Sequence, residues 1–188
     1  MHQDPDLIAK LPKVELHLHL EGAMRYDTYR TLAGHGPDDP ADQWRNPDHR
    51  CAGLSGFLAT TSTALPPCYR SPKFYERVAY ELCQDLIGMG VIHAEVSFGH
   101  RVVPEAGLNF DTILDAIARG WERASTAGEI SVGFIAAVSR RDGAQYAEDM
   151  VNCAIRSQDR GIVGIDLHGD ETASDAKEYA VRSRLLER

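Results

Sequence analysis

The sequence has few of the groups that bind polyanions or cross membranes. Its 188 residues include 28 acidic and only 20 basic ones, giving a net charge of −8. Phosphate binding needs a basic footprint, and Arg140-Arg141 is the longest basic cluster, so we exclude nucleic acid as a partner. No apolar run approaches the roughly 18 residues of a membrane span, which excludes an integral membrane protein. The first ten residues, MHQDPDLIAK, are polar and acidic, unlike a signal peptide, so we expect a cytoplasmic protein.

Cysteine is scarce and widely spaced. The chain has four, with no Cys-x-x-Cys pair: Cys51, Cys68, Cys83 and Cys153. This spacing favours reduced, unpaired thiols over a disulfide framework or a zinc knuckle. The glycine motifs of phosphate-binding loops and the Gly-x-Ser-x-Gly turn of serine hydrolases are also absent, which argues against both of those chemistries.

Four short apolar runs have the character of strands, and a segment with helical spacing follows each. The runs cover residues 14–20, 91–98, 131–138 and 161–167. Strands that alternate with helices indicate a parallel α/β sheet. A complete (β/α)8 barrel takes about 250 residues and rarely fewer than about 200. The chain is therefore too short for a complete barrel, and we expect about four βα units in one parallel sheet.

The helices are predicted from their apolar stripes and end signals. We expect helices over 72–88, about 110–127, about 144–157 and from Thr172 to Leu186. Ser71 is expected to cap the first of these helices, and Asn109 or Asp111 the second. Residues 34–56 form one long irregular insertion, which we interpret as a lid, a helix-containing excursion or a mobile loop. The whole chain, 1–188, is expected to form a single domain.

The first strand carries a distinctive polar face. Alternate side chains of a strand share a face, so Glu15, His17, His19 and Glu21 are expected to point one way. Two imidazoles at this spacing can reach one divalent cation, with the carboxylates in supporting roles. The alternative is an amphipathic edge strand that turns this face to water. Parallel strands are usually covered on both faces, and burying four ionisable groups is costly without pairing or a metal, which makes the metal site as well supported as this alternative.

Three segments carry a resemblance to a known family. The first is Leu11-Pro-Lys-Val-Glu-Leu-His-Leu-His-Leu-Glu-Gly22, the second runs from Val78 to Val96, and the third is Gly164-Ile-Asp-Leu-His-Gly-Asp-Glu171. In this order they resemble the N-terminal signature, the helix and second strand, and the fourth strand end of the adenosine deaminase family, within the amidohydrolase superfamily. The resemblance extends over nearly the whole chain.

The resemblance implies a zinc aminohydrolase on a (β/α)8 barrel. This chain would then form about four of the eight units, a half or truncated TIM-type barrel. In that chemistry the metal acidifies a water, which attacks C6 of an adenine ring and releases ammonia. By position, His17 and His19 correspond to two zinc ligands, Glu21 to a carboxylate near the sugar, and Gly169 to a glycine whose N–H approaches the purine. The substrate is then a purine nucleoside or base. The choice among adenosine, adenine, a methylated adenine nucleotide and a futalosine-type metabolite stays open.

Several positions depart from the family pattern. Glu21 stands where the family often has Asp, Ser97 where it often has Arg, and Ser139-Arg140 where it often has Arg-His. His168 replaces a small residue, and we interpret it as a core or solvent-facing histidine, an obstruction of the base site or an added ligand. Supporting roles around the site are expected for residues near the strand ends: Glu15, Glu95, Asp166, His168 and Asp170.

Two other histidines, His93 and His100, are weaker candidates for the functional site. His93 and Glu95 imitate the His-x-Glu of cytidine-deaminase-type zinc enzymes, but the Pro-Cys-x-x-Cys that should follow is absent. His100 follows the second strand and could lie at the catalytic rim or in solvent.

The family's remaining metal ligands and its general acid come from strands five to eight. The resemblance therefore provides no catalytic acid in this chain, and we expect weak zinc binding and no deamination by the isolated monomer. Exposed edges on the first and fourth strands suggest pairing with a second copy or with a complementary C-terminal half. Further alternatives are a non-catalytic metal-binding half-barrel and an inactive truncated gene product.

Overall fold

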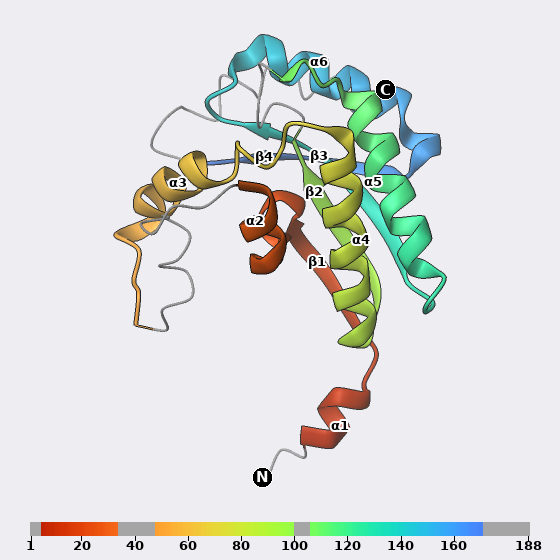
Figure 1. The fold of residues 1–188 in the computed structure, drawn as a ribbon. Helices are drawn as coiled ribbons and strands as arrows, with labels where there is room; N and C mark the ends of the chain where they lie inside the picture. The colour runs from red at the N-terminus through yellow and green to blue at the C-terminus, as the bar shows by residue number, and fades with distance from the viewer. Residues whose placement is uncertain (1–4, 34–47, 100–105, 171–188) are drawn as a thin grey trace.

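The fold is built around one sheet of four parallel strands. The computed structural model describes residues 5–33, 48–99 and 106–170. Its strands are β1 (Lys13–His19), β2 (Val91–Phe98), β3 (Ser131–Ser139) and β4 (Ile162–His168), in the spatial order β1-β2-β3-β4. All three pairings are parallel. This is the predicted order of a half (β/α)8 barrel, in which each strand adds beside the previous one (Figure 1).

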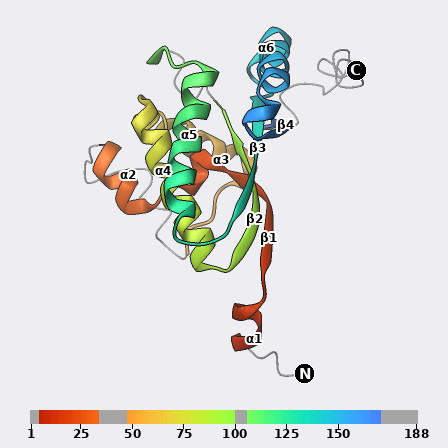
Figure 2. The same cartoon turned by 90° about the vertical axis from the view of Figure 1, so that its right-hand side faces the viewer.

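Helices connect the strands. The helical segments are α1 (Pro5–Lys10), η1 (Leu20–Ala23), α2 (Tyr26–Ala33), α3 (Gly53–Ala64), α4 (Pro72–Gly88), α5 (Phe110–Ser125), α6 (Gly143–Arg156) and η4 (Gln158–Arg160). In both views α4 and α5 lie side by side, and α6 lies apart from them near β3 and β4 (Figures 1 and 2). Among the described residues, no helix combines the length and the apolar character needed to cross a membrane.

The predicted elements agree with the structure except near their ends. β2 has its expected bounds, and β3 is one residue longer than expected. β1 and β4 each differ from the expectation by one residue at both ends. One difference matters: Leu20 and Glu21 belong to the 3-10 turn η1, so Glu21 does not continue the strand alternation as expected. The end of the expected insertion forms the start of α3. Residues 34–47 and the expected helix after Thr172 lie outside the described residues.

The helix caps were predicted with mixed success. Asn109 caps α5, because its side chain accepts a hydrogen bond from Thr112 N at 2.9 Å. Ser71 occupies the corresponding place before α4, but its side chain makes no capping hydrogen bond. Instead, Phe74 N–H donates to the backbone oxygen of Ser71 at 3.1 Å. Pro72 has no N–H, so the first turn has one donor fewer to satisfy.

The core lies between the sheet and α4 and α5. The predicted stripe of α4 is buried throughout, and the face of α5 that contains Ile113, Ile117 and Trp121 is buried against it. The two helices approach closely at Gly120, where an added Cβ would lie 2.1 Å from Glu76 O. Only glycine fits at this crossing, so the α4–α5 contact depends on it.

The sheet is strongly curved. β2 and β3 lie between β1 and β4, yet the rings of His19 and His168 have centroids 5.5 Å apart. Across β3, Ser97 Oγ donates to Asp166 Oδ2 at 3.3 Å. The concave face therefore brings together side chains from strands that are not neighbours, as in a barrel interior.

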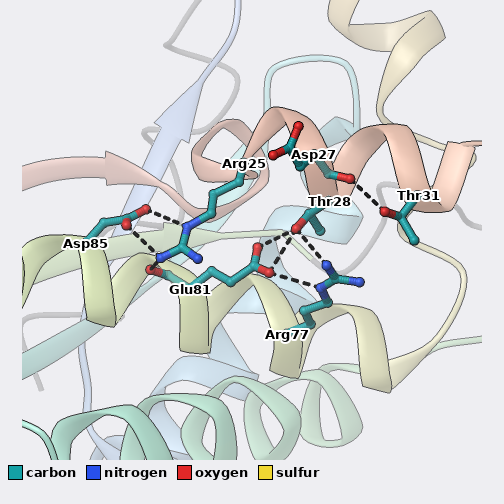
Figure 3. A network of polar contacts seen from close by, with 7 residues as sticks. All are labelled: Arg25, Asp27, Thr28, Thr31, Arg77, Glu81 and Asp85. Atoms are coloured by element: carbon teal, nitrogen blue, oxygen red, sulfur yellow. Dashed lines mark hydrogen bonds and ion pairs between the residues drawn. The ribbon is translucent and has the colours of Figure 1, made fainter.

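A polar cluster attaches α2 to α4. Thr28 Oγ1 lies 2.8 Å and 2.7 Å from the two carboxylate oxygens of Glu81, and both residues are buried. Arg77 donates to Glu81 Oε1 at 3.0 Å and to Thr28 Oγ1 at 3.1 Å. Beside this group, Arg25 pairs with Asp85 at 2.7 Å (Figure 3). Because α2 directly follows η1, this cluster holds the turn that carries Glu21.

The outer face of β1 is uncovered, contrary to expectation. Val14 is 55% exposed and Leu16 57% exposed. On the opposite face His17 is exposed, while Glu15 and His19, like Glu21 in η1, are only partly buried. The premise that four ionisable groups are buried on a covered strand is therefore wrong. No described α-helix packs on β1 as α4 packs on β2.

Candidate functional site

Three histidines meet on the concave face of the sheet. His17 and His19 lie on β1 with ring centroids 5.4 Å apart, and His168 ends β4 with its ring 5.5 Å from that of His19. Burial holds the pKa of His19 below its usual 6.5, His168 and His17 lower it further, and Asp166 opposes them. A neutral imidazole has a free nitrogen lone pair, which is the form that binds metals.

These histidines line a pocket of about 630 Å³ at the carboxyl ends of the strands. In a (β/α)8 barrel this is the end at which substrates bind. Its lining residues come from β1, η1, α3, the carboxyl ends of β2, β3 and β4, and the start of α6. The residues lining it include His17, His19, Glu21, Phe57, Leu58, Thr61, Leu65, Gly99, Ser139, Arg141, Asp142, Tyr146, His168, Gly169 and Asp170.

Glu21 lies at the edge of this pocket in an unusual electrostatic environment. Burial raises the pKa of its carboxyl from 4.5 to about 7, although Gly99 N–H donates to its Oε1 at 2.8 Å and favours the ionised form. The buried Tyr69 hydroxyl donates to Glu21 O at 3.0 Å and so fixes the backbone of the turn. The Tyr75 hydroxyl donates to Gly99 O at 3.5 Å. Two buried tyrosines thus flank the Glu21–Gly99 contact.

The exit of β4 contributes three more of the predicted residues. Gly169 lines the pocket with φ +110°, a conformation that side chains strain, which accounts for glycine there. Asp170 Oδ2 accepts a hydrogen bond from Ser55 at the start of α3, at 3.1 Å. Asp166 receives the Ser97 hydrogen bond described above and lies near enough to His19 to raise its pKa.

Three expected supporting residues, Glu15, Glu95 and Asp166, do not line the pocket. Glu15 Oε1 lies 3.4 Å from the backbone N of His17, and Glu95 pairs in register with Gly133, but neither side chain lines the pocket. His93 contacts Ser131 at 2.7 Å, away from the pocket. His100 lies outside the described residues.

The pocket also contains residues that the sequence did not single out. Phe57, Leu58, Thr61 and Leu65, from α3 and its end, form an apolar wall. Their spacing follows one helical face, and Phe57 is 44% exposed, so this periodicity within a threonine-rich segment was the available signal. Arg141, Asp142 and Tyr146 had no signal of their own, because only the curvature of the sheet brings them opposite β1.

The donor types suit a transition metal, although the site is not closed as it stands. Imidazole is a preferred ligand of zinc. Within residues 5–33, 48–99 and 106–170, no group of three or more histidine, cysteine or acidic side chains is already arranged to hold a metal ion. None of the four cysteines, which all lie in the described part of the chain, forms a disulfide bond.

Curated proteins of related sequence are known. The chain is 30% identical over 177 residues to an adenosine deaminase of Mycobacterium ulcerans, with 88% of the chain and 49% of that protein aligned. It is 33% identical over 174 residues to an adenosine deaminase of Mycobacterium sp. strain KMS, with 87% and 48% aligned. The chain thus spans about half the length of these curated relatives.

Solved structures agree on the fold. Arabidopsis ADAL complexed with IMP superposes with a TM-score of 0.82 at 22% identity, over 97% of this chain and 56% of that one. An adenine deaminase from Arthrobacter aurescens gives 0.78 at 20% identity, over 94% and 54%. An amidohydrolase from Burkholderia ambifaria with bound Zn gives 0.74 at 24% identity, over 95% and 50%.

The match to a family model is consistent with both comparisons. The adenosine deaminase model aligns with residues 12–183, which include all four strands. The chain belongs to the adenosine deaminase family and forms a half (β/α)8 barrel of the family's fold.

Proposed function

We propose that the protein takes part in zinc-dependent hydrolytic deamination of adenosine or a related adenine-containing compound, to the inosine- or hypoxanthine-type product and ammonia. The observation that supports this most strongly is the pair His17 and His19, 5.4 Å apart, in a pocket that also contains Glu21 and Gly169. These are the positions at which the family resemblance places two metal ligands and two substrate contacts.

The residues fit the metal that the family implies. His17 and His19 provide two imidazole ligands on one strand face, and zinc is commonly held by such nitrogens. When bound, zinc lowers the pKa of a water toward neutrality and so provides a nucleophile for C6 of the purine. In our proposal Asp166 orients His19 from behind, as carboxylates near ligating histidines commonly do.

The protein's own groups bind and orient the purine. We propose that the backbone N–H of Gly169 donates to the ring and that the apolar wall of Phe57, Leu58 and Leu65 packs against it. Glu21 lines the same pocket and contacts the sugar. Its carboxyl, raised in pKa to about 7, can donate or accept a hydrogen bond near neutral pH.

We propose that Glu21, which lines the pocket, determines the class of substrate that binds. ADAL is known in complexes with IMP and with GMP, and another neighbour is an N6-mAMP deaminase. A pocket of about 630 Å³ is within the range of sites for small ligands of this size. Because ionised Glu21 would repel a 5′-phosphate, we propose a nucleoside or base rather than a nucleotide.

We also propose that the half-barrel associates through β1. The exposed Val14 and Leu16 and the unpaired edge of β1 form a surface that pairing would cover. The partner is a second copy of the chain or a complementary C-terminal half. Static light scattering of the purified chain should give a mass above 20.8 kDa, and a strictly monomeric protein would remove the second copy as partner.

Thermal stabilisation tests the proposed ligands. Zinc, and then adenosine in the presence of zinc, should each raise the melting temperature, because ligands that bind only the folded state stabilise it. AMP should add less than adenosine. The His17→Ala variant should lose both responses, whereas His93→Ala, which removes a histidine outside the pocket, should keep them. Stabilisation by adenosine that is equal in the His17→Ala variant would contradict the proposal.

A further inference from the structure

We propose that Tyr69 and Tyr75 are positioning residues, which hold Glu21 and Gly99 in the arrangement that recognises a hydroxyl of the substrate's sugar. The inference rests on the proposed sugar contact of Glu21 and adds two residues that do not touch the ligand. Glu21 and Gly99 line the pocket, whereas neither tyrosine does. Both tyrosines are fully buried, so they act on the ligand only through the groups they hold.

Tyr69 holds the main chain of the turn that carries Glu21. Its hydroxyl lies 3.0 Å from Glu21 O and 3.4 Å from Leu20 O, so one donor serves two neighbouring carbonyl groups of η1. Burial, with Glu21 nearby, raises the pKa of Tyr69 well above its usual value, so the hydroxyl keeps its proton and acts as a donor. Tyr69 thus fixes a turn that lies 48 residues earlier in the sequence.

The ring of Tyr69 is itself held by two aromatic neighbours. Its centroid lies 4.6 Å from that of Phe74 and 4.9 Å from that of Tyr75, and both contacts are edge-to-face, the arrangement that aromatic pairs prefer. Connections between helices usually run over the surface, yet Tyr69, between α3 and α4, has no exposed surface. Packing therefore keeps its hydroxyl on η1 and away from water.

Tyr75 acts on the other side of the contact, at the carboxyl end of β2. Its hydroxyl donates to Gly99 O at 3.5 Å, and Gly99 N–H donates to Glu21 Oε1 at 2.8 Å. The backbone of Gly99 therefore links Tyr75 to the carboxyl of Glu21. Because Tyr69 holds the main chain of Glu21 and Gly99 holds its side chain, a sugar hydroxyl meets a carboxyl that is already oriented. Such preorganisation lowers the free-energy cost of binding.

The amide proton of Gly99 reports this arrangement without any ligand. Its NMR signal in the ¹⁵N-labelled full chain should move upfield in Tyr69→Phe, because a displaced turn lengthens the hydrogen bond from Gly99 N to Glu21 Oε1. Tyr75→Phe should move it in the same direction, and this second variant decides the matter where the first folds poorly. A signal at the wild-type position in both variants would overturn the inference.

Tyr80→Phe is the matched control. The Tyr80 hydroxyl accepts a hydrogen bond from Gln84 at 2.9 Å, and its ring lies against Arg123, outside the pocket lining. Removing this hydroxyl should leave the Gly99 signal in place.

Ligand selectivity tests the functional part. The affinities of the zinc-loaded chain for adenosine and for adenine, which lacks the sugar, are measured by isothermal titration calorimetry. Tyr69→Phe should weaken adenosine binding about 2- to 10-fold, the effect of one lost hydrogen bond, and leave adenine binding unchanged. Glu21→Ala should remove the preference for adenosine. Adding Tyr69→Phe to Glu21→Ala should cause no further loss, because the tyrosine acts through the carboxyl.

The outcomes separate this inference from the proposed function. The wild-type ratio of adenosine to adenine affinity in Tyr69→Phe would overturn the role of the tyrosine and leave the proposed function intact. A loss shared equally by adenosine and adenine would do the same, since it indicates a purely structural effect. If the wild-type chain binds neither ligand, the proposed function is contradicted, and the Gly99 signal still decides whether the tyrosines hold Glu21.

Discussion

At the scale of single residues, Glu21 links the site to the stability of the fold. Its carboxyl pKa rises from 4.5 to about 7 on folding, chiefly through burial, so the folded protein holds this proton more tightly than the unfolded chain does. This tighter proton binding stabilises the folded protein. The stabilisation is complete below about pH 4.5 and is lost as pH rises to about 7. The sequence identified Glu21 as a site residue, but its burial depends on η1 and Gly99, which spacing alone does not reveal.

Glu21→Gln should therefore remove a pH dependence. The free energy of unfolding of the wild type should fall, relative to the variant, by roughly 1–3 kcal/mol between pH 4.5 and pH 7.5. Urea unfolding in the presence of a chelator measures this difference. Glu129→Gln, which removes an exposed carboxylate, is the control and should keep the wild-type profile. Parallel profiles for wild type and Glu21→Gln would contradict the burial of this carboxyl.

At the scale of elements, two contacts hold the helices that surround the site. The apolar stripe of α4 was predictable from its four-residue spacing, because a helix repeats its face locally. The Thr28–Glu81 contact and the close approach at Gly120 were not, since each depends on how two helices lie relative to one another. Such pairings follow from the packing of the whole domain rather than from any local pattern.

The buried Thr28–Glu81 contact should contribute more to the free energy of unfolding than the exposed Arg25–Asp85 ion pair beside it. Thr28→Val leaves the Glu81 carboxylate without its buried donor and should lower the free energy of unfolding by about 1–3 kcal/mol. Asp85→Asn breaks the Arg25 pair, whose side chains are 41% and 43% exposed. It should cost less than about 1 kcal/mol. Equal losses in urea unfolding would show that Thr28 and Glu81 do not hold α2.

The α4–α5 crossing should reject any side chain at position 120. Ala is the better helix former by about 1 kcal/mol, yet its Cβ at Gly120 would lie 2.1 Å from Glu76 O. Gly120→Ala should therefore destabilise the protein by about 1–3 kcal/mol. Gly88→Ala at the end of α4 meets nothing within 4 Å and should be neutral or stabilising. Stabilisation by Gly120→Ala would contradict the packing.

At the scale of the whole molecule, the parallel sheet followed from the alternation of strands and helices. The meeting of His19 and His168 did not, because it arises from curvature across two intervening strands. The exposed outer face of β1 was also missed, since the expected cover was inferred from sheets in general. Both misses concern relations between distant elements.

The monomeric 188-residue chain is expected not to deaminate adenosine. By resemblance, the general acid and the other metal ligands belong to strands five to eight of the barrel. Ammonia release by metal-loaded monomer should not exceed that of His17→Ala. A higher rate would show that these four strands contain a sufficient catalytic site.

The proposed function depends above all on whether the pocket binds an adenine compound through its metal. Saturation-transfer NMR of adenosine with zinc-loaded chain measures this contact directly. We predict transfer to the purine protons that disappears with a chelator and in His17→Ala but persists in His93→Ala. No transfer to the zinc-loaded wild type, or equal transfer to His17→Ala, would contradict the assignment of this pocket as the site for metal and purine.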